Sequence, residues 1–565
     1  MLSIRKIGVF GRTYRHLNRY RQILGVLFKY GFGDLIELLR IDQYVEIGLQ
    51  VISRKKRDRV ERLTRAVRIR MAFEELGPTF IKLAQVLSAR PDLIPPDFVA
   101  EMARLQDKVP AADYAKLKGI LREELPRSRQ EIFEYVDETP LASASIAQVH
   151  RARLMDGEEV AVKIQRPGIR KVIEVDLEII LHLATLMERH VEEFAPHRPV
   201  KIVEEFARTL ERELDFVLEA DNMERFAAQF LDDSNIYVPK VFREFSSSRV
   251  LIMEFISGVK VSDLEKIDEV GLDRKTIVER GADFLLRQIF ENGFFHADPH
   301  PGNIYVLPGN VICMLDYGMV GSIVLQTRER FVDLISAVAQ RDAGRAGQVL
   351  LRLTEWDEEP DLRRFEREVD DFIGRHLFRS LKNVEIGALL HELLETAARH
   401  RLRIPSDTFM MMKALATIEG VARMLDPDFE MIAKAAPFVE KVKLERFSPK
   451  RISEDAYRMG ADFLLFLQQF PKDAMEIFRL VRQRKLTVNL AHQGMESMLS
   501  THHQISNRIS FSIIIAGLII GSALIVISEI PPLFYGISLI GIIGFLAAAV
   551  MGIWLLVAIL RKGSL

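Results

Sequence analysis

The chain has 565 residues, more than one compact core usually holds, so we expect two or more domains. Basic and acidic residues nearly balance at a formal net charge of −1, and this total favours no class of charged partner. The single cysteine, Cys313, excludes a disulfide framework and a cysteine-based zinc site, and it suits a reducing compartment.

The first 33 residues carry seven lysines or arginines and no acid, interleaved with aromatic and aliphatic side chains. This pattern predicts a basic amphipathic helix, which either lies on an anionic membrane surface or stays a solvated basic arm. We expect no signal peptide, because no apolar stretch with a small-residue cleavage site follows. Residues 1–70 are taken as this extension, with a second basic stretch at 54–70 that is predicted to be helical. No recognition module accompanies the charges, so no nucleic-acid partner is expected.

Residues 71–130 are predicted to be a helical segment, and the pattern changes near residue 131. Apolar and polar residues alternate on both sides of a Met155-Asp156-Gly157 turn, which predicts two paired antiparallel strands, 145–154 and 158–165. The rest of this lobe, taken as residues 131–262, is predicted to contain helices over 172–234 and a strand with a turn over 249–261.

The second of these strands contains "VAVK", residues 160–163, which matches the motif that places a kinase lysine against nucleotide phosphates. Upstream, where a kinase has a glycine-rich loop, the chain has four small residues, Ala142, Ser143, Ala144 and Ser145. Small side chains let backbone N–H groups approach a phosphate, but alanine and serine lack the freedom of glycine at positive φ. The sequence therefore predicts nucleotide binding by Lys163 and by a stiffer loop than that of an ordinary kinase.

A helix is predicted over 274–292, followed by "HADPHPGN" at 296–303 and "ICMLDYG" at 312–318. A hairpin turning at Pro308-Gly309 would bring Asn303 and Asp316 together, and their oxygens are ligands suited to Mg²⁺. Asp298 would orient or deprotonate an attacking group, as in phosphoryl transfer. The alternatives are an ordinary turn-rich loop and a metal site at His296, His300 and Asp298, for which no third well-placed ligand is evident.

A long helical stretch is predicted from about 324 to 500, and the chain then becomes apolar. Residues 509–528 and 533–560 contain no charge, and "PP" at 531–532 separates them. Each run is long enough to cross a bilayer, so we predict a transmembrane hairpin rather than a buried hairpin of a soluble core. Arg508 before the hairpin, with Arg561 and Lys562 after it, predicts that both ends lie in the cytoplasm.

Six motifs occur together between residues 74 and 322: "KLAQ" (82–85), "LASASIAQVH" (141–150), "VAVK", "ERELDFVLEADN" (211–222), "HADPHPGN" and "LDYG". The set resembles the ABC1/ADCK/UbiB family of atypical protein-kinase-like proteins, and with the C-terminal hairpin the chain is similar to its bacterial UbiB branch. The resemblance implies an α+β, atypical protein-kinase-like fold with a small β-rich N-lobe and a helical C-lobe, together with added helices and the two-helix transmembrane hairpin. We place the C-lobe at 263–440, a helical connector at 441–508 and the hairpin at 509–561.

The resemblance also implies roles for individual residues. Lys163 pairs with Glu219, although this glutamate follows 56 residues later because helices are inserted between the two. Glu254 and Phe255 fall at the hinge that contacts adenine. A regulatory set matches the K-x-G-Q and E-x-D motifs, whose first segment folds over the active site and obstructs a protein substrate: Lys82, Gln85, Glu213 and Asp215. Two positions depart from the family pattern, Ala84 in place of glycine and Ser143 within the alanine-rich loop.

Together these features predict binding of ATP, or ADP, with Mg²⁺, and phosphoryl transfer or ATP hydrolysis with Asp298, Lys163 and Glu219 as the catalytic set. The resemblance implies support of isoprenoid quinone (ubiquinone-type) biosynthesis at the bacterial inner membrane, with the kinase-like domain in the cytoplasm. The expected partners are membrane lipids, isoprenoid quinone precursors and quinone-biosynthesis enzymes. The alternatives are a true kinase acting on a small molecule or lipid, and a non-catalytic membrane scaffold that is regulated by nucleotide.

Overall fold

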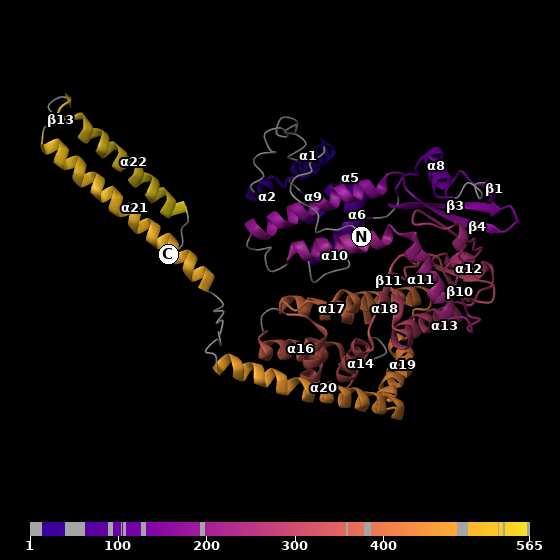
Figure 1. Cartoon of the computed structure of the whole chain (residues 1–565). Helices are drawn as coiled ribbons and strands as arrows, with labels where there is room; N and C mark the ends of the chain where they lie inside the picture. Colours follow the sequence, from indigo (N-terminus) through magenta and orange to yellow (C-terminus); the bar gives the residue numbers. More distant parts are fainter. Residues whose placement is uncertain are drawn as a thin grey trace. The chain divides into compact units, whose positions relative to one another are not determined.

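The computed structural model describes residues 14–39, 63–88, 94–102, 104–105, 109–125, 132–191, 198–356, 360–377, 386–482, 495–528, 530–534 and 537–561. The chain separates into two compact units, Met1–Ser453 and Glu454–Leu565 (Figure 1). The first contains three hydrophobic cores and the kinase-like motifs, and the second contains the apolar C-terminal helices.

The small lobe is built on a five-stranded antiparallel sheet ordered β1-β3-β4-β6, with β2 paired to β3. Its strands are β1 (Phe133–Val136), β2 (Ala142–Ser143), β3 (Ala147–Leu154), β4 (Glu159–Gln165) and β6 (Val250–Glu254). The predicted β3–β4 hairpin is confirmed, and Gly157 takes the positive φ of +90° that its turn requires. Val160, Val162 and Ile164 pack on one face against helix α8 (Tyr114–Glu124), so Ala161 and Lys163 face the other way.

The helical insert predicted over 172–234 consists of three helices, α9 (Ile169–His190), α10 (Pro199–Glu213) and α11 (Phe216–Gln229). Helix α11 begins at Asp215, whose carboxylate accepts a hydrogen bond from the Val217 N–H as an N-cap. Phe216, Met223 and Phe226 anchor α11 in the large core of the unit. This anchoring sets the position of Glu219 against the inner face of the sheet.

A second core joins α9 and α10 to the N-terminal helices α1 (Tyr14–Lys29), α2 (Gly33–Leu38), α5 (Arg65–Leu76), α6 (Pro78–Ser88) and α7 (Pro96–Met102). Tyr20, Ile23 and Leu24 of α1 are buried in it. The predicted helix is confirmed over Tyr14–Lys29, but other helices cover its apolar face, so over these residues that face meets neither a membrane nor solvent. Residues 1–13 and 54–62 lie outside the described residues.

One buried carboxylate ties this helical core together. Asp176 of α9 is fully buried, and Arg19 of α1 donates to its two oxygens at 2.6 and 2.9 Å. The Thr79 hydroxyl of α6 donates to the same carboxylate at 2.7 Å, and Arg19 also donates to the Leu76 carbonyl at the end of α5. Asp176 is thus compensated by a charged and a neutral donor, which a buried charge requires.

The large lobe combines short strands with helices. Its strands are β5 (Ile236–Tyr237), β7 (Val259–Lys260), β8 (Phe294–His296), β9 (Ile304–Leu307), β10 (Val311–Met314) and β11 (Val320–Ser322). They form one sheet ordered β5-β10-β9-β7 and a separate β11–β8 pair. Between β7 and β8 lie the helices α12 (Leu264–Glu269) and α13 (Arg274–Arg287). A π-helical turn, Gln288–Asn292, continues α13. After β11 come the helices α14 (Leu325–Ala339), α15 (Ala343–Leu353), α16 (Leu362–Leu377), α17 (Ile386–Arg399), α18 (Ser406–Leu425) and α19 (Met431–Arg446).

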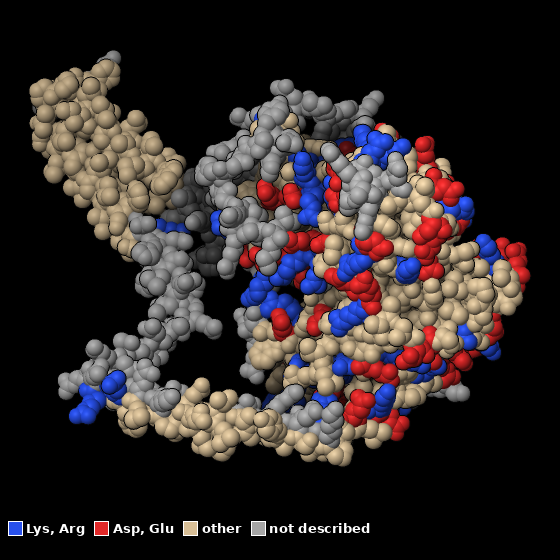
Figure 2. Space-filling model, turned by 45° about the vertical axis from the view of Figure 1, so that its right-hand side comes forward, with Lys and Arg blue, Asp and Glu red and all other residues tan. Residues whose placement is uncertain are grey.

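Helix α20 (Pro449–Arg482) begins in the first unit and continues into the second. The second unit ends in a hairpin of α21 (Met495–Ile527) and α22 (Leu539–Arg561), joined through the short strands β12 (Leu533–Phe534) and β13 (Ile537–Ser538) (Figure 1). Among the described residues, two stretches are long and apolar enough to cross a membrane, Arg508–Ile527 and Leu539–Leu556, and no more than 11% of either is buried. Figure 2 shows the hairpin as an almost entirely uncharged surface, whereas charged side chains cover the first unit.

Candidate functional site

The site is centred on one lysine between two carboxylates. Lys163 Nζ lies 2.7 and 2.8 Å from the two carboxylate oxygens of Glu219 and 3.5 Å from Asp316 Oδ1. The three side chains come from β4, α11 and the turn after β10. Glu219 is 4% exposed, whereas the Asp316 side chain is 49% exposed and is open to a ligand. The expected Lys163–Glu219 pair is therefore formed, and it lies beside Asp316.

Burial and charge shift the pKa values of these three groups in different directions. Burial raises the pKa of Glu219 to about 7, against the pull of Lys163. Burial would also raise the pKa of Asp316, but Lys163 and the Gly318 N–H lower it well below its ordinary value. Desolvation opposes the charge of Lys163, yet the neighbouring carboxylates raise its pKa. Asp316 and Lys163 are consequently both ionised at neutral pH.

A buried histidine connects the catalytic-loop motif to the Asp-Tyr-Gly motif. His296 Nδ1 accepts the Asp298 N–H at 3.1 Å, so its Nε2–H donates to the Asp316 carbonyl. Burial lowers the pKa of His296, which keeps the ring neutral in this tautomer. The His296 ring packs on Tyr317, and Tyr317 packs on Phe226 of α11 at centroid distances of 5.8 and 5.2 Å. Both motifs and α11 are thereby held as one framework.

The predicted hairpin between Asn303 and Asp316 is confirmed. Ile304 of β9 pairs with Met314 of β10, and the Leu315 N–H donates to the Asn303 carbonyl at 3.1 Å. Both proposed metal ligands thus lie at the same end of the hairpin. Among the described residues, no three His, Cys, Asp or Glu side chains gather as a metal site. His300 Nδ1 instead accepts the Gly302 N–H within its own turn.

Asp298 has an ion-pair partner that no sequence motif indicates. Lys413 Nζ of α18 lies 2.8 Å from Asp298 Oδ1, and each side chain is about 30% exposed or less. Burial raises the pKa of Asp298, but Lys413 outweighs this effect and lowers it. The signal that could have found this residue is the isolation of Lys413, the only charged residue in the otherwise apolar helical stretch 408–418.

The alanine-rich loop is pinned at its base. The Ala144 N–H donates to the Ala147 carbonyl at 2.9 Å, and Arg166 donates to the Ala144 carbonyl and to the Ser143 hydroxyl, both at 2.7 Å. The Ser145 side chain is fully buried, and its hydroxyl has no hydrogen-bond partner among the described residues. Ala142 lies on β2 opposite Val149. These contacts agree with the expectation of a stiff loop.

Glu254 and Phe255, the two predicted hinge residues, contact groups outside the Lys163 cluster. The Glu254 carboxylate accepts hydrogen bonds from the Tyr237 hydroxyl at 2.7 Å and the Lys240 N–H at 3.2 Å. The Phe255 N–H donates to the Glu159 carbonyl, and the Arg151 guanidinium lies 4.6 Å from the centre of the Phe255 ring. None of these partners belongs to the Lys163 cluster. These contacts do not test the expected contact of Glu254 and Phe255 with adenine, which stays a prediction.

Two of the four predicted regulatory residues form an ion pair, and the regulatory role of all four stays a prediction. Lys82 of α6 lies 3.4 Å from Glu213 at the end of α10, and the charge of Lys82 also helps to lower the pKa of Asp316. Asp215 is the N-cap of α11, as described above. Gln85 is partly buried, and its carbonyl accepts the Ser88 hydroxyl. Helix α6 thus presents its lysine to the candidate site.

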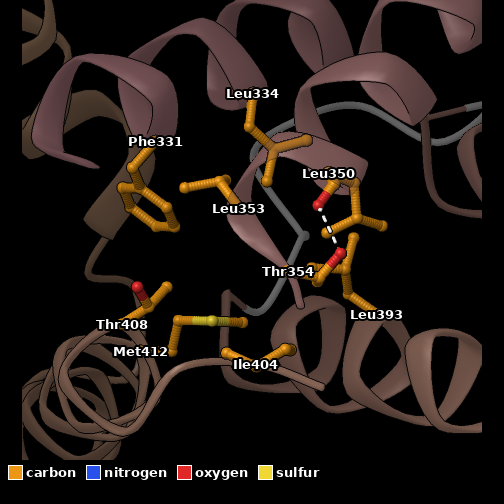
Figure 3. Close-up of a pocket in the computed structure, with 9 residues that line it drawn as sticks. All are labelled: Phe331, Leu334, Leu350, Leu353, Thr354, Leu393, Ile404, Thr408 and Met412. Atoms are coloured by element: carbon orange, nitrogen blue, oxygen red, sulfur yellow. Dashed lines mark hydrogen bonds between the residues drawn. The ribbon is translucent and has the colours of Figure 1, made fainter. Parts of the chain in front are cut away.

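A small cavity in the large lobe does not add a second site. It measures about 10 Å³ and is lined by mostly apolar side chains of α14, α15, α17 and α18, with Thr354 and Ile404 beside these helices (Figure 3). The Thr354 hydroxyl at its edge donates to the Leu350 carbonyl of its own helix. A cavity of this size and polarity holds no ordered water and is a packing gap.

Three family models match this chain. The ABC1 atypical kinase-like domain matches residues 104–350, the UbiB helical domain 369–430, and the ABC1/UbiB kinase-like C-terminal domain 493–561. A Clostridium pasteurianum protein, described as uncharacterized and encoded in the hydrogenase 1 5' region, is 32% identical over 97% of this chain and 99% of its own length. The chain belongs to the ABC1/UbiB family.

Other members of the ABC1/UbiB family carry a functional name. A protein of Pseudomonas fluorescens described as "Probable protein kinase UbiB" is 35% identical over 77% of this chain and 83% of its own length. A solved complex of Rv3197 with erythromycin from Mycobacterium tuberculosis has a TM-score of 0.44 and 23% identity, covering 62% of this chain and 89% of that one. The ABC1 match contains Lys163, Glu219, Asp298 and Asp316, and the UbiB helical match contains Lys413.

Proposed function

We propose that this ABC1/UbiB protein is a membrane-anchored atypical kinase or ATPase that binds Mg²⁺-ATP and supports isoprenoid quinone biosynthesis. The observation that carries the proposal is the position of Lys163, within 2.8 Å of both Glu219 oxygens and 3.5 Å from Asp316. An ionised lysine held by a buried glutamate, next to an ionised aspartate, is the arrangement that nucleotide phosphates and their metal require in kinases.

The residues present fit the metal and the nucleotide. Two carboxylates around one lysine leave an excess of negative charge, which a divalent cation would neutralise. Asp316 and Asn303 would hold Mg²⁺ with their oxygens, and the bound ion would neutralise charge on the phosphates. Lys163 binds phosphate oxygens and is oriented by Glu219. The alanine-rich loop would supply backbone N–H groups other than that of Ala144, which already donates to the Ala147 carbonyl.

Asp298 is the residue that positions the attacking hydroxyl or water. Its backbone N–H is held by His296, and its carboxylate is held by Lys413, so both halves of the residue are fixed before substrate arrives. Lys413 keeps the carboxylate ionised and therefore able to accept a proton at Oδ2. Preorganised charge of this kind is the main catalytic contribution expected in phosphoryl transfer.

The apolar hairpin supports the membrane part of the proposal. Two spans without charge would anchor the kinase-like unit at the bacterial inner membrane, where isoprenoid quinone precursors are dissolved. ATP turnover next to lipid would drive the extraction of these precursors or their presentation to quinone-biosynthesis enzymes. The "UbiB" name of the Pseudomonas relatives supports the quinone assignment.

The test is the quinone and precursor profile of a deletion strain of the native host, complemented with the wild type or with Asp316→Asn. We expect only the wild type to restore quinone. Restoration by both would replace the proposal with a scaffold whose metal site is dispensable. An unchanged profile in the deletion strain would refute the quinone role. Label from [γ-³²P]ATP recovered in a lipid or small molecule would identify a kinase, and label recovered only in phosphate would identify an ATPase.

A further inference from the structure

Helix α20 leaves a broad apolar face uncovered. Nine large side chains of this helix, all in the second unit, are between 48 and 79% exposed: Tyr457, Met459, Phe463, Leu464, Phe466, Leu467, Phe470, Met475 and Phe478. At 100° per residue they occupy one side of the helix, with Ala456, Gly460 and Ala474 between them. This stripe is far larger than the single exposed apolar residues that a water-facing helix usually carries.

The opposite side of α20 is polar. At 100° per residue, Gln468, Gln469 and Arg479 fall on it, and Leu465 is an apolar exception on that side. The helix is therefore amphipathic over about six turns, from Tyr457 to Phe478, with one face suited to water and one suited to an apolar medium. Pro471 lies within the apolar face and removes one backbone donor there.

We propose that α20 lies in the plane of a lipid bilayer surface, with its Phe-, Leu- and Met-rich face among the upper acyl chains. The inference rests on the proposed membrane anchoring, because α20 is followed after twelve residues by α21, whose apolar span starts at Arg508. The C-terminal end of α20 carries Arg479 and Arg482, and Arg484 and Lys485 follow in the sequence. Basic residues at this position favour anionic headgroups.

A bilayer explains the exposed face better than a protein partner does. The apolar stripe covers about half of the helix circumference and combines five aromatic side chains with two flexible methionines, whereas a helix pair needs only a narrow two-position seam. Continuity with two candidate membrane spans places the stripe within reach of lipid. The test must therefore distinguish a bilayer from two other partners for this face, a second copy of the chain and a different protein.

The test uses full-length protein in vesicles of phosphatidylcholine and phosphatidylglycerol. Cys313 is fully buried, so an introduced cysteine can be labelled selectively with an environment-sensitive fluorophore. The apolar-face position is Phe470→Cys, and the matched control is Gln468→Cys, two residues away and about 200° around the helix. Ile519→Cys in α21 reports separately on the hairpin. Nitroxides attached to the lipid chains act as quenchers.

We expect a blue-shifted emission at position 470 and loss of most of its intensity to shallow chain nitroxides, with neither effect at position 468. Quenching at 519 by deep nitroxides shows that the hairpin spans the bilayer. Water-like emission at 470 together with quenching at 519 overturns the inference for α20 and leaves the anchoring intact. A blue shift at 470 without lipid quenching assigns the face to a protein surface and also overturns it. Absence of quenching at 519 refutes the anchoring itself.

Discussion

The two units of this chain distribute charge and apolar surface in opposite ways. The first unit buries Asp176, Glu219 and His296 and gives each a polar partner, while its apolar side chains form three cores. The second unit leaves most of its large apolar side chains exposed. The first unit is thus organised around buried charges, whose electrostatic interactions are stronger than they would be in water. The second unit is suited to an apolar medium such as the interior of a bilayer.

Helices α1 and α20 show the same contrast in single elements. Both have an apolar and a polar face. In α1 the apolar face is covered by the helical core, and Arg19 reaches across to a buried aspartate. In α20 the apolar face has no cover within the described residues. An amphipathic pattern therefore predicts that a helix has an apolar partner, but it does not say whether the partner is protein or lipid.

The largest expected effect comes from removing the charge that is exposed at the site. Asp316→Asn should lower kcat for ATP hydrolysis roughly 10²–10³-fold, the loss typical of one preorganised electrostatic group. Steady-state hydrolysis by the purified, detergent-solubilised protein measures it. Asp232→Asn, on an exposed aspartate, is the control and should leave kcat unchanged. Equal activity in the two variants would show that Asp316 takes no part in catalysis.

A stability experiment tests whether the hydrogen-bond donors around the buried Asp176 stabilise the first unit. Arg19→Met leaves Asp176 buried with only the Thr79 hydroxyl as a donor, so the free energy of unfolding should fall by about 3 kcal/mol. The urea midpoint measured by circular dichroism reports the change. Arg21→Met, on an exposed arginine of the same helix, should shift it little. The double variant Arg19→Met with Asp176→Leu should recover most of the loss, and no recovery would contradict the compensation.

The Lys413–Asp298 pair predicts a shift in pH dependence. Lys413 lowers the pKa of Asp298 while burial raises it, so Lys413→Met should raise that pKa. Activity that needs the carboxylate is then lost at a higher pH, and we expect the acid limb of the kcat profile to move to higher pH. Lys434→Met breaks a similar 2.8 Å pair with Asp283 and serves as the control. An unmoved acid limb in Lys413→Met would restrict Lys413 to a structural role.

The smallest effect is expected at the contact between α6 and the site. Lys82 and Glu213 are partly exposed and 3.4 Å apart, and such a pair contributes about 0.2–1 kcal/mol. If the pair holds α6 over the site, Lys82→Met should raise ATP turnover by about two- to fivefold. Lys441→Met, which removes a more exposed pair with Glu291, should have no effect on turnover. Lower turnover in Lys82→Met would make Lys82 a part of the site rather than a restraint on it.

The sequence by itself determined the local geometry of this protein. The β3–β4 hairpin, the hairpin from Asn303 to Asp316 and the two apolar C-terminal spans all follow from residues that are close in the chain, whose turn chemistry and periodicity are legible. The Lys163–Glu219 pair, across 56 residues, was reached only through the family resemblance.

Only the tertiary structure decided which distant residues meet. Lys413 lies 115 residues from Asp298, and Arg19 lies 157 residues from Asp176, so no local pattern relates the members of either pair. The same holds for the hinge, where Tyr237 and Lys240 bind Glu254. For the same reason, the apolar face of α1 is buried and that of α20 is exposed. The free energy of covering an apolar face depends on the surface that the fold brings to it, and that surface is set by the whole chain.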